Sequence, residues 1–194
     1  MPDRFPGIGS APGTPDALPS SDRLRFRPWD ESDFERARSL WGDADVMRFL
    51  SHAGAYSDQQ VRDRLAREQA ALEAIGVQYW AIFLSETGEF AGCSGLKVCP
   101  YVGSPEAPEL ELGFHLMPTM WGRGLATAAG EAVARFAFEQ MGLKRVYAGH
   151  HPANDASRHV LTKLGFRYHK DVFFEPTGEM HPLYVLEPSD RPGP

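Results

Sequence analysis

Cysteine is scarce in this sequence: Cys93 and Cys99 are the only two among 194 residues. A disulfide framework would need more of them, and their spacing matches no zinc pattern, so we expect free thiols in a reducing cytosol. Long apolar runs are also lacking. No stretch approaches the roughly 20 residues that span a bilayer, and the N-terminus has no signal-peptide core. We therefore expect a cytoplasmic protein with no membrane partner.

Positive charge is in short supply as well, since 20 Lys and Arg are set against 26 Asp and Glu, for a formal net charge of −6. A general nucleic-acid binder needs a basic face to meet phosphates, so we expect no nucleic-acid partner. An acidic surface would instead suit a cationic amine or peptide substrate. No set of His, Cys, Asp and Glu has the spacing of metal ligands, and we expect no metal.

The length of 194 residues, with 42% hydrophobic and 24% charged residues, fits one globular domain. Residues 1–21 are rich in Pro, Gly, Ser and Ala and have almost nothing to bury, which predicts a disordered N-terminal tail. Residues 189–194 predict a C-terminal tail. The folded domain is therefore expected to span residues 22–188.

Hydrophobic periodicity predicts a mixed α/β domain with hairpins and one crossover helix. Ser57 and Gln60 form a capping box at one helix start, and Gly76 closes that helix. A loop containing Pro105 and Pro108 is expected before the strand that precedes the crossover. The expected order is strand 24–27, helices 30–41 and 57–76, strands 79–84, 90–96 and 110–116, a helix that begins at Gly124 and ends at Gly142, strand 145–149, helix 155–164, and strands 166–173 and 183–186.

The most informative stretch joins a strand to a helix through glycine: Met117-Pro118-Thr119-Met120-Trp121-Gly122-Arg123-Gly124-Leu125-Ala126-Thr127. Glycines there let backbone N–H groups converge on an anion, and the helix N-terminus adds unpaired donors. A P-loop is excluded because no Lys-Ser/Thr follows the glycines. The dinucleotide fingerprint is incomplete, because Thr127 stands where a third glycine or alanine belongs. Taken alone, the pattern predicts either a phosphate site or merely a tight turn.

Three motifs in order make the chain similar to the GNAT acetyltransferase superfamily, in its RimJ/RimL-type branch. The first is Trp121-Gly122-Arg123-Gly124-Leu125-Ala126, which occupies the acetyl-CoA signature, with Trp where the general signature has Gln or Arg. The second is the upstream strand Glu111 to Pro118, and the third is Asn154-Asp155-Ala156-Ser157 followed by Lys163-Leu164-Gly165-Phe166. Leu24 to Trp29 and Val46 to Leu50 fit the branch's opening, so the resemblance covers about residues 24–186.

The resemblance implies a single GNAT-type domain, in which a central mixed sheet, flanked by helices, is splayed between its fourth and fifth strands. Acetyl-CoA would lie in the gap. Backbone groups of Phe114, His115 and Leu116 would pair with the pantetheine arm like a borrowed strand. Asn154 would hydrogen-bond the cofactor near the pantetheine end. The pyrophosphate would be held by the N–H groups of Arg123, Gly124, Leu125, Ala126 and Thr127.

Direct acetyl transfer needs a base for the amine and a partner for the leaving thiolate. Glu111 is our first candidate for the base because many family members carry a glutamate on this strand; the alternative is an outward-facing glutamate on a solvated face. Glu109 is a weaker candidate. Some GNAT enzymes place a tyrosine where this chain has Leu161, so we consider the Ser157 hydroxyl as the thiolate partner. Its alternative role is to serve the first turn of its helix or the cofactor backbone.

Three histidines are further catalytic candidates because histidine titrates near neutrality: His115, His150 and His151. A structural or solvent-facing role is the alternative for each. Acceptor specificity is expected from the first two helices with loop 51–56 and from the final hairpin 173–181. Tyr56, Phe173, Phe174 and His181 are candidates for the channel wall, and ordinary hairpin packing is the alternative.

The function expected from the resemblance is acetyl-CoA-dependent N-acetyl transfer to a primary amine. The acceptor is left open between a protein N-terminus, another peptide, a polyamine and an antibiotic-like small molecule. A non-catalytic acyl-CoA-binding sensor of the same fold would carry the same cofactor motifs, and a nucleotide-dependent oxidoreductase would also use Gly122 and Gly124. A homodimer is a further expectation, because dimers are common in this branch.

Overall fold

A computed structural model of the chain describes residues 17–105 and 107–191, so most of the expected N-terminal tail and residues 192–194 lie outside the described part. One seven-stranded sheet has the order β1-β2-β3-β4-β5-β7-β6. Its strands are β1 (Leu24–Arg27), β2 (Tyr79–Leu84), β3 (Phe90–Ser104), β4 (Ala107–Leu116), β5 (Val146–Gly149), β6 (Arg167–Phe174) and β7 (Glu179–Leu186). The helices are α1 (Phe34–Trp41), α2 (Ala44–Met47), α3 (Asp58–Ile75), α4 (Leu125–Arg135) and α5 (Asp155–Leu164).

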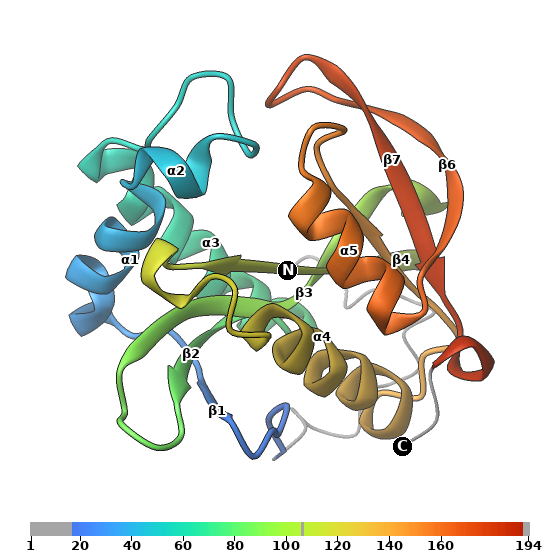
Figure 1. Cartoon of the computed structure of the whole chain (residues 1–194), viewed down its shortest axis with the longest axis horizontal. Helices are drawn as coiled ribbons and strands as arrows, with labels where there is room; N and C mark the ends of the chain where they lie inside the picture. Colours follow the sequence, from blue (N-terminus) through green and yellow to red (C-terminus); the bar gives the residue numbers. More distant parts are fainter. Residues whose placement is uncertain (1–16, 106, 192–194) are drawn as a thin grey trace.

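In Figure 1 the hairpin of β6 and β7 stands apart from β1 and β2, and the sheet opens between β4 and β5. All neighbouring strands are antiparallel except these two, which run parallel and share one register pair, Glu111 with Tyr147. Beyond that pair the strands separate, so the edge of β4 toward its C-terminal end faces a wedge instead of a partner strand. The predicted mixed, splayed α/β fold is confirmed.

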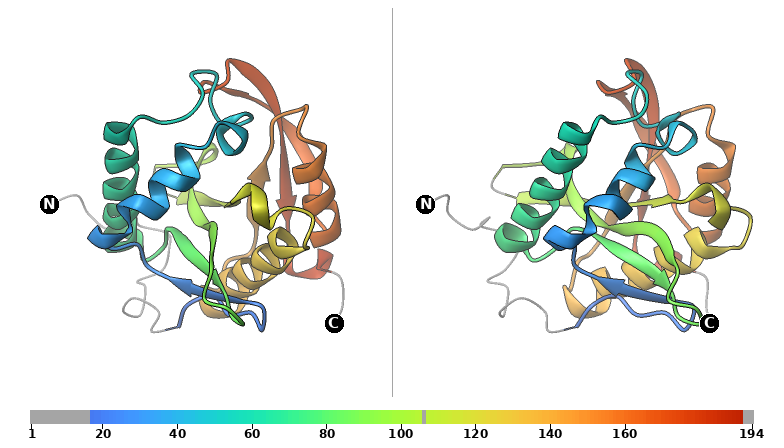
Figure 2. Two further views of the ribbon diagram at one scale, coloured as in Figure 1. Left: turned by 60° about the vertical axis from the view of Figure 1, so that its left-hand side comes forward. Right: turned by 90° about the vertical axis from the view of Figure 1, so that its left-hand side faces the viewer.

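The helices cover both faces of the sheet, as the two turned views in Figure 2 show. One core packs α4 and α5 against the sheet, with Leu112 and Leu116 of β4 inside it. A second core packs α1, α2 and α3 against the opposite face, where Trp41 and Tyr79 are buried. Because side chains of a strand alternate between faces, Glu111, Gly113 and His115 of β4 lie on the face of the second core.

Local signals explain most of the element boundaries. The predicted capping box at the start of α3 is present, since Ser57 and Gln60 exchange side-chain and backbone hydrogen bonds, and Gly76 ends the helix in the left-handed conformation. The expected loop with Pro105 and Pro108 is instead part of a long β3–β4 hairpin, in which a register shift between Cys99 and Gly103 takes up the irregularity.

The two ends of the described chain lie against the domain. Pro19 is buried, and the Ser20 carbonyl accepts a hydrogen bond from Arg135 at the end of α4. At the other end, Asp190 pairs with Arg167 of β6, with 2.9 Å between Nη2 and Oδ2. No helix within residues 17–105 and 107–191 is long and apolar enough to cross a membrane.

Candidate active site

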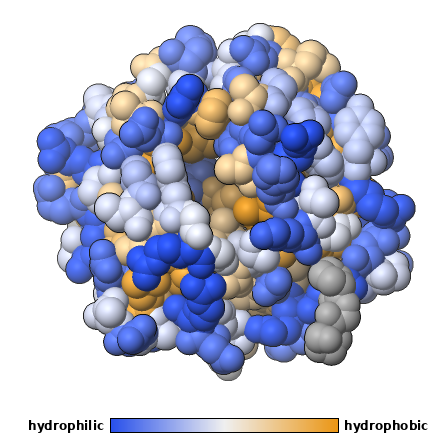
Figure 3. Space-filling view, viewed as in Figure 1, coloured by the Kyte–Doolittle hydropathy of each residue, from blue (hydrophilic) through white to orange (hydrophobic). Residues whose placement is uncertain are grey.

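The wedge between β4 and β5 holds a groove of about 440 Å³, within the range of roughly 300–1,000 Å³ typical of ligand pockets. Figure 3 shows the surface of the protein on the side that faces the viewer in Figure 1. This surface is hollowed at its centre, with hydrophobic side chains in the hollow. The groove is walled by the end of β4, the turn before α4, the first turn of α4, one side of α5, and α2 with the residues that follow it. Of the predicted cofactor residues, those that line it are Phe114, His115, Leu116, Gly124, Leu125, Ala126, Thr127 and Asn154.

The turn before α4 has the geometry expected of an anion-binding loop. Gly122 and Gly124 both have a φ of 72°, a conformation that favours glycine, and Gly124 is the N-cap of α4. No side chain among the described residues caps this helix, so its first N–H groups remain available at the groove.

Arg123 lies outside the groove lining, unlike its neighbours in the turn. Its Nη1 lies 3.0 Å from the Met120 sulfur, and its carbonyl accepts a hydrogen bond from Arg23 Nη2 at 2.8 Å. Arg23 was not predictable from the sequence, because no local pattern links it to a turn that lies 100 residues further along the chain. Arg23 ties the segment before β1 to the outer side of the turn.

Trp121 takes up one of the backbone groups that were expected to meet the pantetheine arm. Its indole Nε1 donates to the Leu116 carbonyl at 2.9 Å, while 49% of its surface stays exposed. The edge of β4 available for strand-like pairing is therefore shorter at its C-terminal end.

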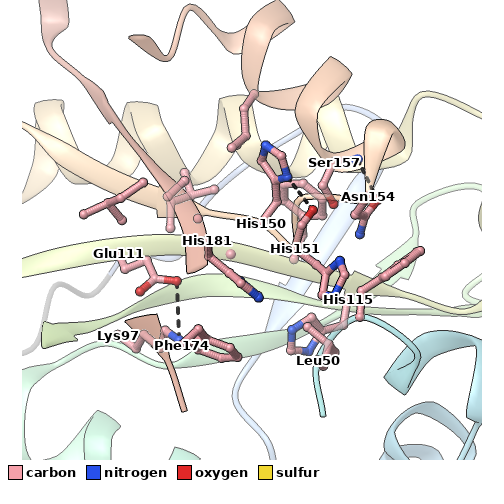
Figure 4. Close-up of a pocket in the computed structure, with 18 of the residues that line it drawn as sticks. Leu50, Lys97, Glu111, His115, His150, His151, Asn154, Ser157, Phe174 and His181 are labelled. Atoms are coloured by element: carbon pink, nitrogen blue, oxygen red, sulfur yellow. Dashed lines mark hydrogen bonds and ion pairs between the residues drawn. The ribbon is translucent and has the colours of Figure 1, made fainter. Parts of the chain in front are cut away.

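A second cavity adjoins the groove, and the two share six lining residues, which form the junction: Phe49, Leu50, Phe114, His115, Asn154 and Ser157. At the junction, Asn154 caps α5 by accepting the Ser157 backbone N–H at 3.0 Å on its Oδ1, which leaves its amide NH₂ free to donate. The Ser157 hydroxyl takes part in no hydrogen bond among the described side chains. Figure 4 shows Leu50, His115, Asn154 and Ser157 around the cavity.

Glu111 lines the second cavity and is largely buried, with 12% of its side chain exposed. Its Oε1 lies 3.4 Å from Lys97 Nζ, across the register pair of β3 and β4. Glu109 shares the face of Glu111 but does not line the cavity, and its Oε1 is 3.3 Å from Arg145 Nε. The structure thus separates two glutamates that look alike in the sequence.

Histidines gather on the opposite wall of the second cavity, where β5 ends and β7 begins: His150, His151 and His181. His151 Nε2 lies 3.2 Å from Glu179, and its ring lies edge-on to His181, with 5.2 Å between ring centroids. Burial lowers the pKa of His181 to about 4, so this ring is neutral at pH 7. Burial also lowers the pKa of His150, whose Nε2 is 3.3 Å from the Tyr184 hydroxyl.

A buried indole fixes one of the ring nitrogens of His115. The Trp41 indole Nε1 donates to His115 Nδ1 at 3.1 Å. Burial, with Arg64 and Lys97 nearby, holds the pKa of His115 well below its usual range. The ring is therefore a neutral imidazole at the junction.

The two segments expected to determine the acceptor touch each other over the cavity. The backbone N–H of His52 donates to the Pro176 carbonyl at 2.9 Å, which joins the α2–α3 loop to the β6–β7 turn. Figure 1 shows these segments approaching at the top of the wedge. Phe174 and His181 line the cavity, whereas Phe173 is 57% exposed and Tyr56 packs in the second core.

Several cavity residues were not anticipated from the sequence: Phe49, Tyr79, Lys97 and Tyr101. They come from the turn after α2, from β2 and from β3, so no local spacing predicts that they meet. Lys97 could have been anticipated only from the register of the β3–β4 hairpin, which places it directly opposite Glu111. No group of three or more His, Cys, Asp or Glu in the described part of the chain is arranged to hold a metal ion.

Comparisons with known proteins identify the family of this architecture. A family model described as an acetyltransferase (GNAT) domain matches residues 23–167. FsC-acetyl coenzyme A-N(2)-transacetylase of Aspergillus fumigatus is 28% identical over 156 residues, which cover 78% of this chain and 65% of that protein. A GNAT-family acetyltransferase from Bacillus anthracis superposes with a TM-score of 0.72 at 20% identity, covering 88% of this chain and 98% of that one. RimL, an alpha-N-protein acetyltransferase in complex with coenzyme A, gives 0.69 at 16% identity, with 88% and 97% covered.

Proposed function

The chain belongs to the GNAT acetyltransferase family, and we propose that it transfers an acetyl group from acetyl-CoA directly to a primary amine. The family assignment bears out the expected enzyme class. One observation carries the proposal further: a groove with a glycine turn and a free helix start meets a carboxylate-bearing cavity at one junction. Such a wedge lets a donor and an acceptor approach the same point from two sides.

The groove fits acetyl-CoA, which would supply an activated acetyl thioester. The N–H groups of Leu125, Ala126 and Thr127 at the start of α4 suit the pyrophosphate, because they are unpaired donors at the positive end of the helix dipole. The unpaired edge of β4 suits the pantetheine amides. The Asn154 amide NH₂ offers a further donor near the junction.

We assign the acceptor to the second cavity, with Glu111 as its base. During transfer the amine nitrogen bonds to the carbonyl carbon, the carbon–sulfur bond breaks, and the amine gives up a proton. Glu111 would take that proton, and the Ser157 hydroxyl would donate to the departing thiolate. Glu111 and His115 are four residues apart on β4, or about 13 Å along an extended strand, so a proton from an amine at the junction would reach the carboxylate through water.

The proposal is tested by an acceptor panel with the full-length protein, monitored by release of free CoA thiol and by mass spectrometry of the products. The panel contains peptide N-termini, polyamines and aminated small molecules, and acetyl-CoA binding is measured in parallel by calorimetry. We expect binding together with turnover of at least one primary amine. Binding with no turnover across the panel would favour the acyl-CoA sensor, and no binding would sink the assignment of the groove.

A further inference from the structure

His115 occupies the place where the groove and the second cavity meet, since it lines both of them. Its ring lies on the same face of β4 as Glu111, and Gly113 lies between them in the strand. A side chain on Gly113 would collide with the Tyr79 ring, whose hydroxyl oxygen lies 2.0 Å from the place of a Cβ. The ring of Tyr79 in turn stands edge-on to His115, with 5.5 Å between ring centroids.

The hydrogen bond from Trp41 determines which His115 nitrogen carries the proton. An indole N–H only donates, so His115 Nδ1 accepts that bond with its lone pair. A neutral imidazole with an unprotonated Nδ1 carries its proton on Nε2. No other described side chain bonds Nε2, so this N–H is free to donate at the junction.

The surroundings keep the ring in that neutral state. The titratable groups near it are Arg64 of α3, Lys97 and Cys93 of β3, Tyr79 of β2 and Glu111 on its own strand. Burial opposes protonation and holds the pKa of His115 well below the ordinary value, and the two cations act in the same direction. The basic lone pair is occupied by Trp41, so His115 is poorly suited to act as a base.

We propose that His115 Nε2–H donates a hydrogen bond to the acetyl carbonyl oxygen and stabilises the negative charge that develops there. The inference rests on the proposed function, and it assigns His115 as a catalytic donor and Glu111 as the base. Fixed donors aimed at a developing oxyanion are a large source of rate enhancement.

Trp41 acts in this scheme as a positioning residue. It is 1% exposed, and the Arg64 guanidinium lies over its ring at 5.1 Å from the centroid. Arg64 is held in turn by Glu68, with 2.7 Å between Nε and Oε1. The chain of contacts from Glu68 through Arg64 and Trp41 therefore ends at the accepting Nδ1 of His115, which leaves the ring proton on Nε2.

The tautomer is tested first, by nitrogen-15 NMR of histidine-labelled protein between pH 5.5 and 9. We expect His115 to stay neutral with its proton on Nε2 throughout this range. In Trp41→Phe the Nδ1 partner is gone, and we expect a mixture of the two neutral forms. A His115 signal that titrates near neutrality, or that carries its proton on Nδ1 in the wild type, would overturn the proposal.

The contact with the acetyl group is tested by infrared difference spectra of bound acetyl-CoA labelled with carbon-13 at the carbonyl. The wild type should lower the carbonyl stretching frequency relative to free acetyl-CoA, and His115→Phe should return it toward the free value. His169→Gln, which changes an exposed histidine of β6 outside both cavities, should match the wild type. Failure of the wild type to bind acetyl-CoA would sink the proposed function, whereas binding with an unshifted frequency would overturn the role of His115 alone.

Kinetics distinguish a donor from a base and from an acceptor contact. Removing one oxyanion donor costs about 10²–10³-fold in kcat, and we expect His115→Phe to fall in this range with an unchanged acceptor KM. His115→Gln keeps an N–H donor near the place of Nε2 and should recover part of the loss, equally at every pH. A loss that vanishes at alkaline pH would indicate a base instead, and a raised acceptor KM with normal kcat would indicate recognition of the acceptor; either outcome overturns the proposal.

Discussion

Replacing Glu111 with glutamine tests its proposed role as the base that accepts the proton of the amine. The neighbouring Glu109 provides a matched control. The two glutamates lie two residues apart on one face of β4, and each pairs with a half-exposed cation at 3.4 or 3.3 Å. Glu111→Gln and Glu109→Gln therefore remove the same charge and the same kind of ion pair. Only Glu111 lines the cavity, so a difference between the variants reports on that position.

The expected magnitudes follow from the environment of each carboxylate. General-base catalysis contributes about 10²–10⁴-fold, and transfer through water over the four-residue span from His115 to Glu111 favours the lower end of this range. We expect kcat of Glu111→Gln to fall about 10²-fold, equivalent to about 2.7 kcal/mol of transition-state stabilisation. Because Lys97 is 40% exposed, the lost ion pair costs at most about 1 kcal/mol of stability, or roughly 2–4 °C in Tm. Glu109→Gln should show the same small change in Tm and a normal kcat.

The assay is acetyl transfer followed by thiol release, from pH 6.5 to pH 10, with the acceptor identified from the panel. The deficit of Glu111→Gln should shrink as pH rises, because more of the amine is then already neutral. Acetyl-CoA affinity should stay within a few-fold of the wild type. Equal kcat values for the Glu111 and Glu109 variants, or a deficit that is constant with pH, would refute the assignment of Glu111 as the base.

Three further predictions concern the groove, the chain ends and the response to pH. Thr127→Glu should keep α4 stable, because a carboxylate suits the third helical position. Its negative charge should weaken acetyl-CoA binding at least tenfold, about 1.4 kcal/mol, relative to the neutral control Thr127→Gln. Equal affinities of the two variants in calorimetry would contradict the pyrophosphate site. Deleting residues 1–16 should leave Tm unchanged, whereas deleting residues 1–21 also removes the contact of Ser20 with Arg135 and should lower Tm by about 2–4 °C. The pKa of His181 is about 4 in the folded chain against 6.5 ordinarily, so the unfolded chain binds the proton more readily. The contribution of His181 to the free energy of unfolding is therefore complete above pH 6.5. It falls by at most about 3 kcal/mol as pH drops to 4. Urea unfolding at pH 7 and pH 5 should show a smaller loss in His181→Phe, and equal losses would argue against the assigned titration.

Much of the fold was predictable because its signals are local. The capping box of Ser57 and Gln60, the alternation of β4 and the glycine turn before α4 each depend on residues within one element or turn. The β3–β4 hairpin was not predictable in detail, because Pro105 and Pro108 are typical of a loop, whereas the structure accommodates them beside a register shift. Pairing across the hairpin outweighs the local preference of proline there.

Of the proposed site, only the glycine turn and the helix start that line the groove were predictable from a local motif. Leu125, Ala126 and Thr127 follow one another in sequence, so a motif can indicate them. The bond of Trp41 to His115 joins residues 74 positions apart. The cavity likewise brings Lys97 together with His181, and such convergence depends on strand register and helix packing that no local pattern contains. For the same reason the sequence did not separate Glu109 from Glu111.

We expect the unpaired edge of β4 to affect how the protein behaves in storage. A strand edge with free N–H and C=O groups is a template for a strand of another molecule, and Leu112, Phe114 and Leu116 give this edge an apolar character. A ligand lying along the edge would compete with such intermolecular pairing. Protein kept with CoA should therefore aggregate more slowly than protein kept without it, even in a variant that no longer turns over.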